Sequence, residues 1–292
     1  MVKTNPFFSI IIPTYNRAHI IHRPIDSIIA QTFTDWELII VDDGSIDDTK
    51  SIVDLYQDER IRYVRQENKK ESAARNNGIC LSNGEWICFQ DSDDEYLSQH
   101  LQILYNSISQ FSEYKVFRTG LLIYEGGNFK SKSTLEETNY DQFPYECFQV
   151  FSFHKSIFNS ISFDERFFIA EDLHFLLQIG LNHKIKIIDD WTGIYYYDPK
   201  SSGGVGPNYE VNLLNRRLCF DDILRWNKIL ILPFLKISRC RVELLMLYGH
   251  YKYNKKKMAF SYLELIKVIY RFPKSFITLV VKLVYQKFVN TI

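Results

Sequence analysis

An alternation of short apolar runs with helix-periodic segments constrains the fold of this chain most. Residues 7–12, FFSIII, form an apolar run of the kind that is buried on both faces of a sheet, and Pro13 ends it. Residues 20–31 carry apolar side chains at helical spacing, and residues 37–41 form a second apolar run. A strand, a helix and a strand of these lengths predict a βαβ unit with parallel strands and a right-handed crossover.

The same alternation continues over the first 200 residues. Further strands are expected at 60–64, 85–89, 116–124 and 185–188. Further helices are expected after a capping box at 45–48, at 71–81, from about residue 98, and at 173–181. Asn83-Gly84 is a C-cap signal for the helix at 71–81. Gly126-Gly127 predicts a turn, and residues 201–206 are turn-rich. The expected fold is α/β: a Rossmann-like, mostly parallel sheet with helices on both faces, then a helical C-terminal region. We expect domains at 1–207 and 208–292.

Composition narrows the class of protein. Apolar residues make up 46% of the 292, enough for a large core. The five cysteines are scattered without a CxxC pair, which argues against a disulfide framework or zinc site and suits a reducing compartment. No secretory signal and no apolar run of about 18 residues is visible. We therefore expect a cytoplasmic protein.

Charge is distributed unevenly along the chain. Residues 225–292 hold 14 Lys and Arg against two Asp and Glu, whereas residues 1–224 hold 21 against 33. Basic residues interleaved with apolar ones are typical of helices that lie on an anionic membrane surface, and a helical bundle with a solvated basic face is the alternative. We expect peripheral association with the inner face of the membrane, and no nucleic-acid partner.

Acidic and polar residues follow three of the predicted strands, at Pro13–Arg17, Asp42-Asp43 and Asp91–Asp94. Ligands of open parallel sheets bind beyond the carboxyl ends of the strands. No GxGxxG and no GxxxxGK[ST] is present, so dinucleotide and P-loop sites lose their support. Asp91 and Asp93 could reach one Mg²⁺ or Mn²⁺ ion together. A plain turn and N-cap cluster is the alternative explanation.

Five segments in order carry a resemblance to a known family: SIIIPTYNR at 9–17, LIIVDDGS at 38–45, ARNNG at 74–78, GEWICFQDSDD at 84–94, and Glu171-Asp172 opening an apolar helix. Together they resemble family 2 glycosyltransferases, which have the GT-A fold. The resemblance covers roughly residues 7–200.

The resemblance implies a donor site. Pro13 and Tyr15 would flank the nucleobase, Asp43 would accept a hydrogen bond from the imide N–H of uracil while Asp42 supports the turn, and Arg75 would lie near the nucleotide. Each residue also has a structural alternative: Tyr15 could be a core aromatic, and Arg75 a surface helix residue.

The resemblance also implies a metal site and a base. Asp93 would bind Mn²⁺ or Mg²⁺, Asp91 and Ser92 would touch the metal or the donor, and Asp172 would be the general base. Glu171-Asp172 could instead be an acidic pair favoured at a helix N-terminus. The chain departs from the family at 68–72, NKKES, where small residues are usual. It also departs at Asp198, which stands where many relatives have a metal-binding His. Asp198 would be an oxygen ligand of the metal instead, and the alternative is that the third protein ligand is absent.

The reaction implied is an inverting transfer of a single sugar from a UDP-sugar to an acceptor hydroxyl, with a lipid-linked or surface-polysaccharide glycan as acceptor. The QxxRW signature of processive synthases is not evident, since residues 224–226 read LRW without the Gln. Two other hypotheses remain open: a phosphate-handling receiver-like protein, which would be about half this length, and a membrane-associated GT-A-like protein that binds nucleotide without catalysis.

Overall fold

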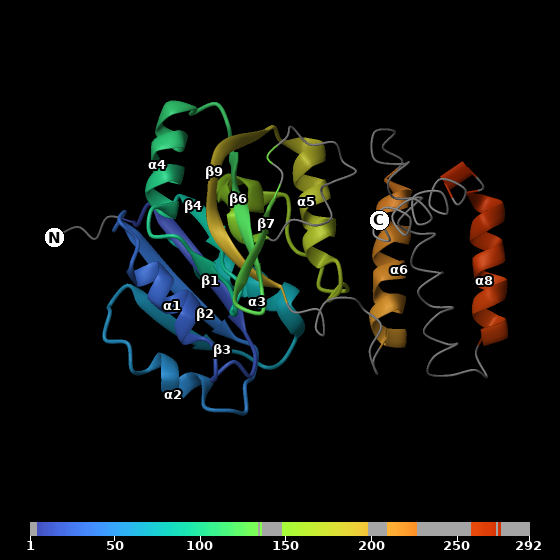
Figure 1. The fold of residues 1–292 in the computed structure, drawn as a ribbon, viewed down its shortest axis with the longest axis horizontal. Coiled ribbons are helices and arrows are strands. Elements are labelled where there is room, and N and C mark those ends of the chain that lie inside the picture. The colour runs from blue at the N-terminus through green and yellow to red at the C-terminus, as the bar shows by residue number, and fades with distance from the viewer. Residues whose placement is uncertain are drawn as a thin grey trace. The chain divides into compact units, whose positions relative to one another are not determined.

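A computed structural model describes residues 5–133, 135, 148–197, 209–226, 258–272 and 274–275 of the chain. It divides into two compact units, 1–198 and 199–292, and each is described by itself. The first unit is a β-sheet between helices, and the described part of the second is helical (Figure 1).

The first half of the sheet consists of four parallel strands in the order β3-β2-β1-β4. Their bounds are β1 Phe8–Thr14, β2 Trp36–Asp42, β3 Ile61–Arg65 and β4 Trp86–Phe89. Every residue of β1 and β4 is buried, as expected for strands covered on both faces. The predicted βαβ unit is therefore confirmed.

The second half of the sheet is mixed. It adds β8 (Phe151–His154), β6 (Val116–Glu125), β9 (Ile185–Tyr197) and β5 (Glu95–Tyr96), and β7 (Asn128–Lys132) pairs with β6. β8 is antiparallel to both β4 and β6, and β6 is parallel to β9. Because two reversals cancel, β6 and β9 run in the direction of β4, and their carboxyl ends reach the same edge of the sheet.

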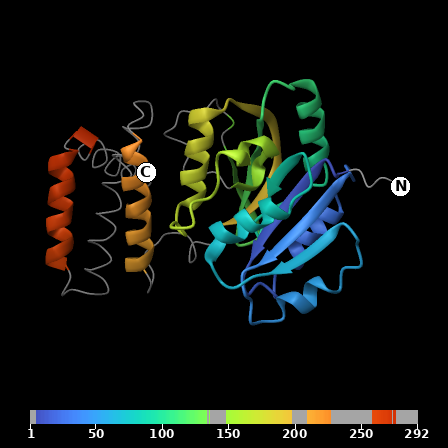
Figure 2. The ribbon, with the colours of Figure 1, turned by 180° about the vertical axis from the view of Figure 1, so that it is seen from behind.

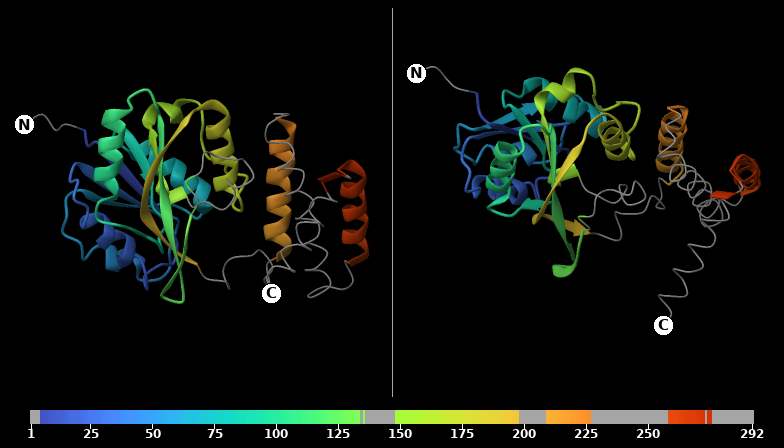
Figure 3. Two further views of the ribbon diagram at one scale, coloured as in Figure 1. Left: turned by 45° about the horizontal axis from the view of Figure 1, so that its top comes forward. Right: turned by 90° about the horizontal axis from the view of Figure 1, so that it is seen from above.

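Helices cover both faces of the sheet, as predicted. On one face α1 (His22–Ile29) and α4 (His100–Gln110) pack in a core cluster with side chains of β1 and β2. On the other face α3 (Lys70–Leu81) and α5 (Glu171–Asn182) pack with the alternate side chains of the same strands. Figures 2 and 3 show these two layers from other directions. The remaining short helices are α2 (Thr49–Val53), η2 (Phe148–Val150) and η3 (Lys155–Asn159).

Two predicted helix ends differ from the structure. The capping box at 45–48 is wrong: α2 begins at Thr49 without a side-chain cap, and the Ser45 hydroxyl accepts from the Asn16 amide instead, at 2.8 Å. Gly84 is not a helix C-cap, since α3 is capped by Ser82. A Cβ on Gly84 would lie 2.6 Å from the backbone nitrogen of Ser9, so close packing against β1 requires glycine there. The predicted turn at Gly126-Gly127 is confirmed by positive φ at both residues.

The second unit contains α6 (Tyr209–Arg225) and α8 (Met258–Arg271), which confirms a helical C-terminal region. Arg217 Nη1 on α6 lies 4.0 Å from Glu264 Oε2 on α8. Among the described residues, no helix has the length and apolar character needed to cross a bilayer. Residues 198–208 lie outside the described part, so the predicted boundary at 207/208 stays a prediction.

Candidate active site

A cleft opens where β1, β2 and β4 end. It is lined by the loop after β1, the acids after β2 and β4, and the first turns of α3: Pro13, Thr14, Tyr15, Arg17, Asp43, Glu71, Ala74, Arg75, Asp91, Ser92 and Asp93. The parallel strands bring these residues together because their carboxyl ends share one edge. The predicted position of the site is therefore where the structure has its cleft.

The loop after β1 is held firmly at the cleft wall. Asn16 has a left-handed backbone, with φ of 54°, and its side-chain oxygen accepts from the Ile46 amide at 2.9 Å. The Asp43 amide donates to the Thr14 carbonyl at 2.8 Å. Tyr15, between these anchors, is 45% exposed, so it is not the core aromatic of the alternative explanation. Its ring is open to a ligand.

The two acids after β2 have different surroundings. Asp42 is fully buried and accepts from the Ser45 amide at 2.7 Å and from the Tyr63 hydroxyl, so it supports the turn. Asp43 accepts from the amides of Lys69 and Lys70, at 2.8 and 2.7 Å. Its Oδ1 also accepts from the Gln66 side chain at 2.8 Å. Donors behind the carboxylate thus orient it toward the cleft that it lines.

Arg75 connects two parts of the site. Its side chain is only 7% exposed, which excludes a surface role. Nη1 donates to Glu171 Oε1 at 2.8 Å, and Nη2 lies 3.4 Å from Asp91 Oδ1. Burial opposes the charge of Arg75, but Glu171 and Asp91 outweigh it and raise its pKa. The guanidinium therefore ties the acids after β4 to the start of α5.

The turn after β4 presents three aspartates in three environments. Asp94 is buried and accepts from the Tyr196 amide at 2.9 Å, and burial followed by the nearby Asp91 and Asp93 raises its pKa well above the usual value. Asp91 is half-buried, and burial raises its pKa too, while Arg75 works against this shift. Asp93 is the most open of the three, with 46% of its side chain exposed. Its Oδ2 lies 3.5 Å from Arg17 Nη2.

Asp172 lies in the first turn of α5, directly after Glu171. The residue before the helix, Ala170, has a left-handed backbone with a φ of 64°. Burial, and next the neighbouring charge of Glu171, raise the pKa of Asp172 to about 6. The Leu173 amide, which donates to Oδ1 at 2.6 Å, and the charge of Arg75 partly oppose the shift. A carboxyl with this pKa is ionised at neutral pH yet accepts a proton more readily than an ordinary aspartate.

The acids of the cleft suit a hard divalent ion. Asp91 and Asp93 are separated by one residue and supply carboxylate oxygens, the ligand type that Mg²⁺ and Mn²⁺ prefer. The pKa of Asp91 is raised partly by Asp93 and Glu171, so a cation between these groups would relieve the repulsion. The residues present fit the metal that the sequence predicts.

Seven of the predicted site residues line the one cleft: Pro13, Tyr15, Asp43, Arg75, Asp91, Ser92 and Asp93. Asp172 adjoins it through Glu171 and Arg75. Asp198, predicted as a metal ligand, lies outside the described residues. Arg17 was expected at this edge of the sheet but without a role of its own, and no sequence signal indicated Glu71.

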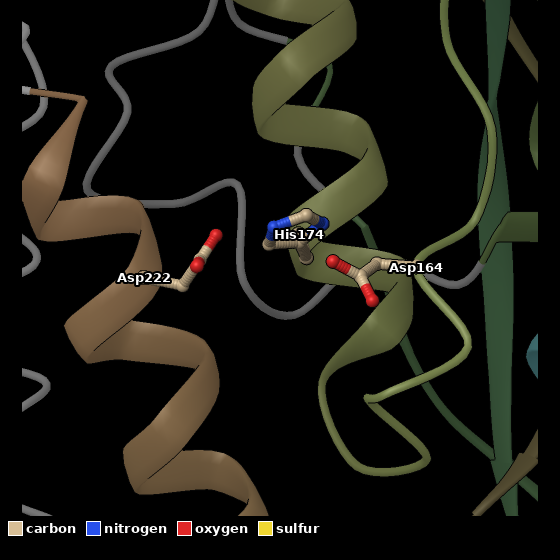
Figure 4. A group of neighbouring side chains, drawn as sticks. All are labelled: Asp164, His174 and Asp222. Carbon is tan, nitrogen blue, oxygen red and sulfur yellow. The ribbon is translucent and has the colours of Figure 1, made fainter.

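Two further polar side chains of the first unit lie together near the start of α5. Asp164 precedes α5 and His174 is on it, and their side chains lie near one another (Figure 4). Asp222, also drawn there, belongs to α6 of the second unit.

The sequence model of Glycosyl transferase family 2 matches residues 9–167, more than half of the chain. This chain belongs to glycosyl transferase family 2. The match includes every residue that lines the cleft and ends before Asp172.

Curated relatives of the family are similar over part of their length. A GalNAc(5)-diNAcBac-PP-undecaprenol beta-1,3-glucosyltransferase of Campylobacter jejuni is 35% identical over 176 residues, 56% of this chain and 56% of that protein. The UDP-Glc:alpha-D-GlcNAc-diphosphoundecaprenol beta-1,3-glucosyltransferase WfgD of Escherichia coli is 35% identical over 122 residues, 39% of this chain and 48% of that protein. The matched part thus spans about half the length of these relatives.

Solved structures share the fold. S. aureus TarS 1-349 in complex with UDP-GlcNAc has a TM-score of 0.62 at 24% identity, covering 85% of this chain and 74% of that one. Mannosyltransferase PcManGT from Pyrobaculum calidifontis, in complex with GDP-Man and Mn²⁺, has a TM-score of 0.60 at 17% identity, covering 85% and 72%. These neighbours confirm the GT-A-type α/β fold of this family 2 member.

Proposed function

We propose that this protein is a metal-dependent, inverting glycosyltransferase that moves one sugar from a UDP-sugar to the hydroxyl of a lipid-linked or surface-polysaccharide glycan. One observation carries the proposal. The guanidinium of Arg75 binds Asp91 with one nitrogen and Glu171 with another, so the expected metal ligands and the expected base belong to one charged network.

The base in this reaction is Asp172. An inverting displacement needs one carboxylate that removes the acceptor proton as the acceptor oxygen attacks the anomeric carbon, and no covalent intermediate. Burial holds the pKa of Asp172 near 6, so the carboxylate is ionised at pH 7 and can take that proton. Arg75 and Glu171 hold the start of α5 beside the cleft.

The donor would bind against the walls of the cleft. The exposed ring of Tyr15 can stack on a base, and the oriented carboxylate of Asp43 can accept from the imide N–H of uracil. The TarS structure contains UDP-GlcNAc, which supports a uracil nucleotide, whereas PcManGT contains GDP-Man, so guanine is the base to test against it.

Asp91 and Asp93 would hold Mn²⁺ or Mg²⁺, with Asp198 as a third oxygen ligand. Such an ion, when bound, would neutralise the charge that develops on a departing diphosphate. The Mn²⁺ in the PcManGT complex supports a divalent metal in this fold. Arg75 keeps the Asp91 carboxylate in place, and Ser92 lines the cleft between the two acids.

The acceptor is inferred from two of the relatives, the proteins of Campylobacter jejuni and Escherichia coli described above, which are named for undecaprenol-linked substrates. The basic residues of 225–292 would bring the protein to the anionic membrane where such a lipid resides. We place it at the cytoplasmic face as a peripheral protein.

Hydrolysis of nucleotide sugars without acceptor tests this function. A thermal-shift panel of UDP- and GDP-sugars, with and without Mn²⁺, would first identify the donor that binds. We then expect slow, Mn²⁺-dependent hydrolysis of that UDP-sugar. Asp93→Ala should abolish metal-dependent UDP binding and leave the unfolding temperature near that of the parent, because Asp93 is half exposed. UDP binding without any turnover would favour the alternative, a GT-A-like protein that binds nucleotide only.

A further inference from the structure

Besides Arg75, which contacts Asp91, two arginines reach the turn after β4, and one of them holds its backbone in place. Arg23 on α1 donates from Nη1 to the Asp93 carbonyl at 2.9 Å and pairs with Glu95 at 3.3 Å. Its guanidinium carbon also lies 4.1 Å from the centre of the Tyr196 ring. Three partners at once keep this arginine in place, and with it the backbone of the turn.

The other arginine, Arg17, holds only side chains of the turn. Its Nε donates to Ser92 Oγ at 3.2 Å, and Nη2 lies 3.5 Å from Asp93 Oδ2. The side chain of Arg17 is 41% exposed and that of Asp93 is 46% exposed, so water screens the pair and it is weak. The Arg17 amide donates to Thr49 Oγ1 at 2.9 Å, which anchors the backbone while leaving the long side chain able to turn.

A divalent ion at Asp93 would compete with this contact. The ion and the guanidinium repel one another, and Arg17 lies against Oδ2, one of the two oxygens that Asp93 can offer an ion. Arg75, the other arginine that lines the cleft, is buried between Asp91 and Glu171 and is committed to them. Arg75 keeps Glu171 as a partner even when a metal binds Asp91, whereas the half-exposed Arg17 can leave Asp93 and turn within the cleft.

We propose that Arg17 is an exchangeable counter-ion: it occupies Asp93 in the metal-free enzyme, yields that carboxylate to the metal, and then binds phosphate oxygens of the donor. This inference rests on the metal-dependent function proposed above. Arg17 lines the cleft, and its planar fork of N–H donors matches phosphate oxygens. In this exchange the Arg17 guanidinium stays inside the cleft and changes its partner from the Asp93 carboxylate to the donor phosphate.

The test uses the full-length protein with Mn²⁺ alone and with pyrophosphate at saturating Mn²⁺, both measured by calorimetry. Arg17→Ala should bind Mn²⁺ about two- to fivefold more tightly, because the competing cation is gone. The same variant should bind pyrophosphate at least about tenfold more weakly, because a charged phosphate contact is lost. Pyrophosphate makes the result independent of base and sugar.

Three matched variants sharpen the result. Arg23→Ala should weaken Mn²⁺ binding, the opposite sign, because a brace is removed. Arg17→Lys should keep Mn²⁺ affinity near the parent value. Arg62→Ala, at an exposed position of β3 that does not line the cleft, should change neither affinity. Unchanged or weaker Mn²⁺ binding by Arg17→Ala would overturn the exchange, and unchanged pyrophosphate binding would overturn the phosphate contact. A parent protein that binds no Mn²⁺ would refute the metal-dependent function itself.

Discussion

At the scale of single residues, Asp172 combines a position with a pKa suited to its proposed task. The carboxyl of Asp172 is half-buried beside Glu171, and the resulting pKa of about 6 has a direct consequence for activity. Below pH 6 the folded protein holds the group protonated, and a protonated carboxyl cannot accept the proton of the acceptor. Turnover should therefore rise with pH through a limb near 6.

We predict that Asp172→Asn lowers turnover at pH 7.5 by at least about a hundredfold and leaves donor affinity unchanged, since a positioned base contributes on the order of 10²–10⁴. Turnover and the donor dissociation constant would be measured on the same preparation. Near-parent turnover, or a limb near pH 6 that persists in the residual activity, would remove Asp172 from the role of base.

Lys70 is a second residue of interest, because its backbone conformation should lower the free energy of unfolding. It begins α3 with a φ of 73°, and its amide donates to Asp43. A left-handed backbone costs a non-glycine residue about 1–2 kcal/mol. Glycine in place of lysine would remove that cost but would lose about 0.5–1 kcal/mol through the greater freedom of the unfolded chain.

Lys70→Gly should therefore raise the free energy of unfolding, by up to about 1 kcal/mol, in urea denaturation. Lys69→Gly is the matched control, because Lys69 has an ordinary φ of −131° and would gain nothing from glycine. It should destabilise the protein by about 0.5–1 kcal/mol. Equal effects of both substitutions would mean that the backbone at Lys70 carries no strain.

At the scale of elements, α3 lies unusually close to β1. A Cβ on Gly78 would lie 2.4 Å from Cγ2 of Ile11, a side chain buried in the core. This close approach brings Arg75, one turn earlier on α3, to the carboxyl ends of the strands. The glycine inside a helix therefore serves the position of the site.

Gly78→Ala tests this packing. Alanine would gain about 1 kcal/mol in helix propensity, but overpacking a core typically costs 1–3 kcal/mol. Because Ile11 Cγ2 is fixed close to its backbone and cannot turn aside, we expect a net loss of up to about 2 kcal/mol in urea denaturation. A stabilised variant would show that α3 can move away from β1 at no cost.

At the scale of the whole molecule, charge separates the body from the C-terminal region. Residues 225–292 hold 14 basic residues against two acidic ones. Attraction to an anionic leaflet is worth up to about 1 kcal/mol per basic residue near the surface and falls off within a Debye length. A few lipid-facing residues would thus give salt-sensitive binding.

We predict that the full-length protein sediments with anionic vesicles at low salt and is partly released at high salt. A shortened chain ending at Arg225 should stay in the supernatant. Neutral vesicles are the control, and the full-length protein should not sediment with them. If the full-length protein ignores anionic vesicles at low ionic strength, its basic residues are solvated and the membrane proposal fails.

The sequence alone was sufficient for the order of strands and helices in the first half of the sheet and for the edge at which ligands bind. Both follow from local patterns: apolar runs mark buried strands, helical spacing marks the crossovers, and polar residues directly after strands mark the edge. The same local logic did not predict β5, β7 or β8, because these short strands are defined by their partners and carry weak patterns of their own.

The tertiary structure decided how the site residues are connected. Arg75 meets Glu171 across 96 residues of chain, and the Asp94 carboxylate meets the Tyr196 amide across 102. Arg17, which follows a strand like the acids do, acquires its role only because the turn after β4 lies opposite it. The spacing of apolar residues is a local property of the sequence, so strands and helices can be predicted from it segment by segment. The pairing of charges depends on distances between segments far apart in sequence, and only the packed sheet and its helices set those distances.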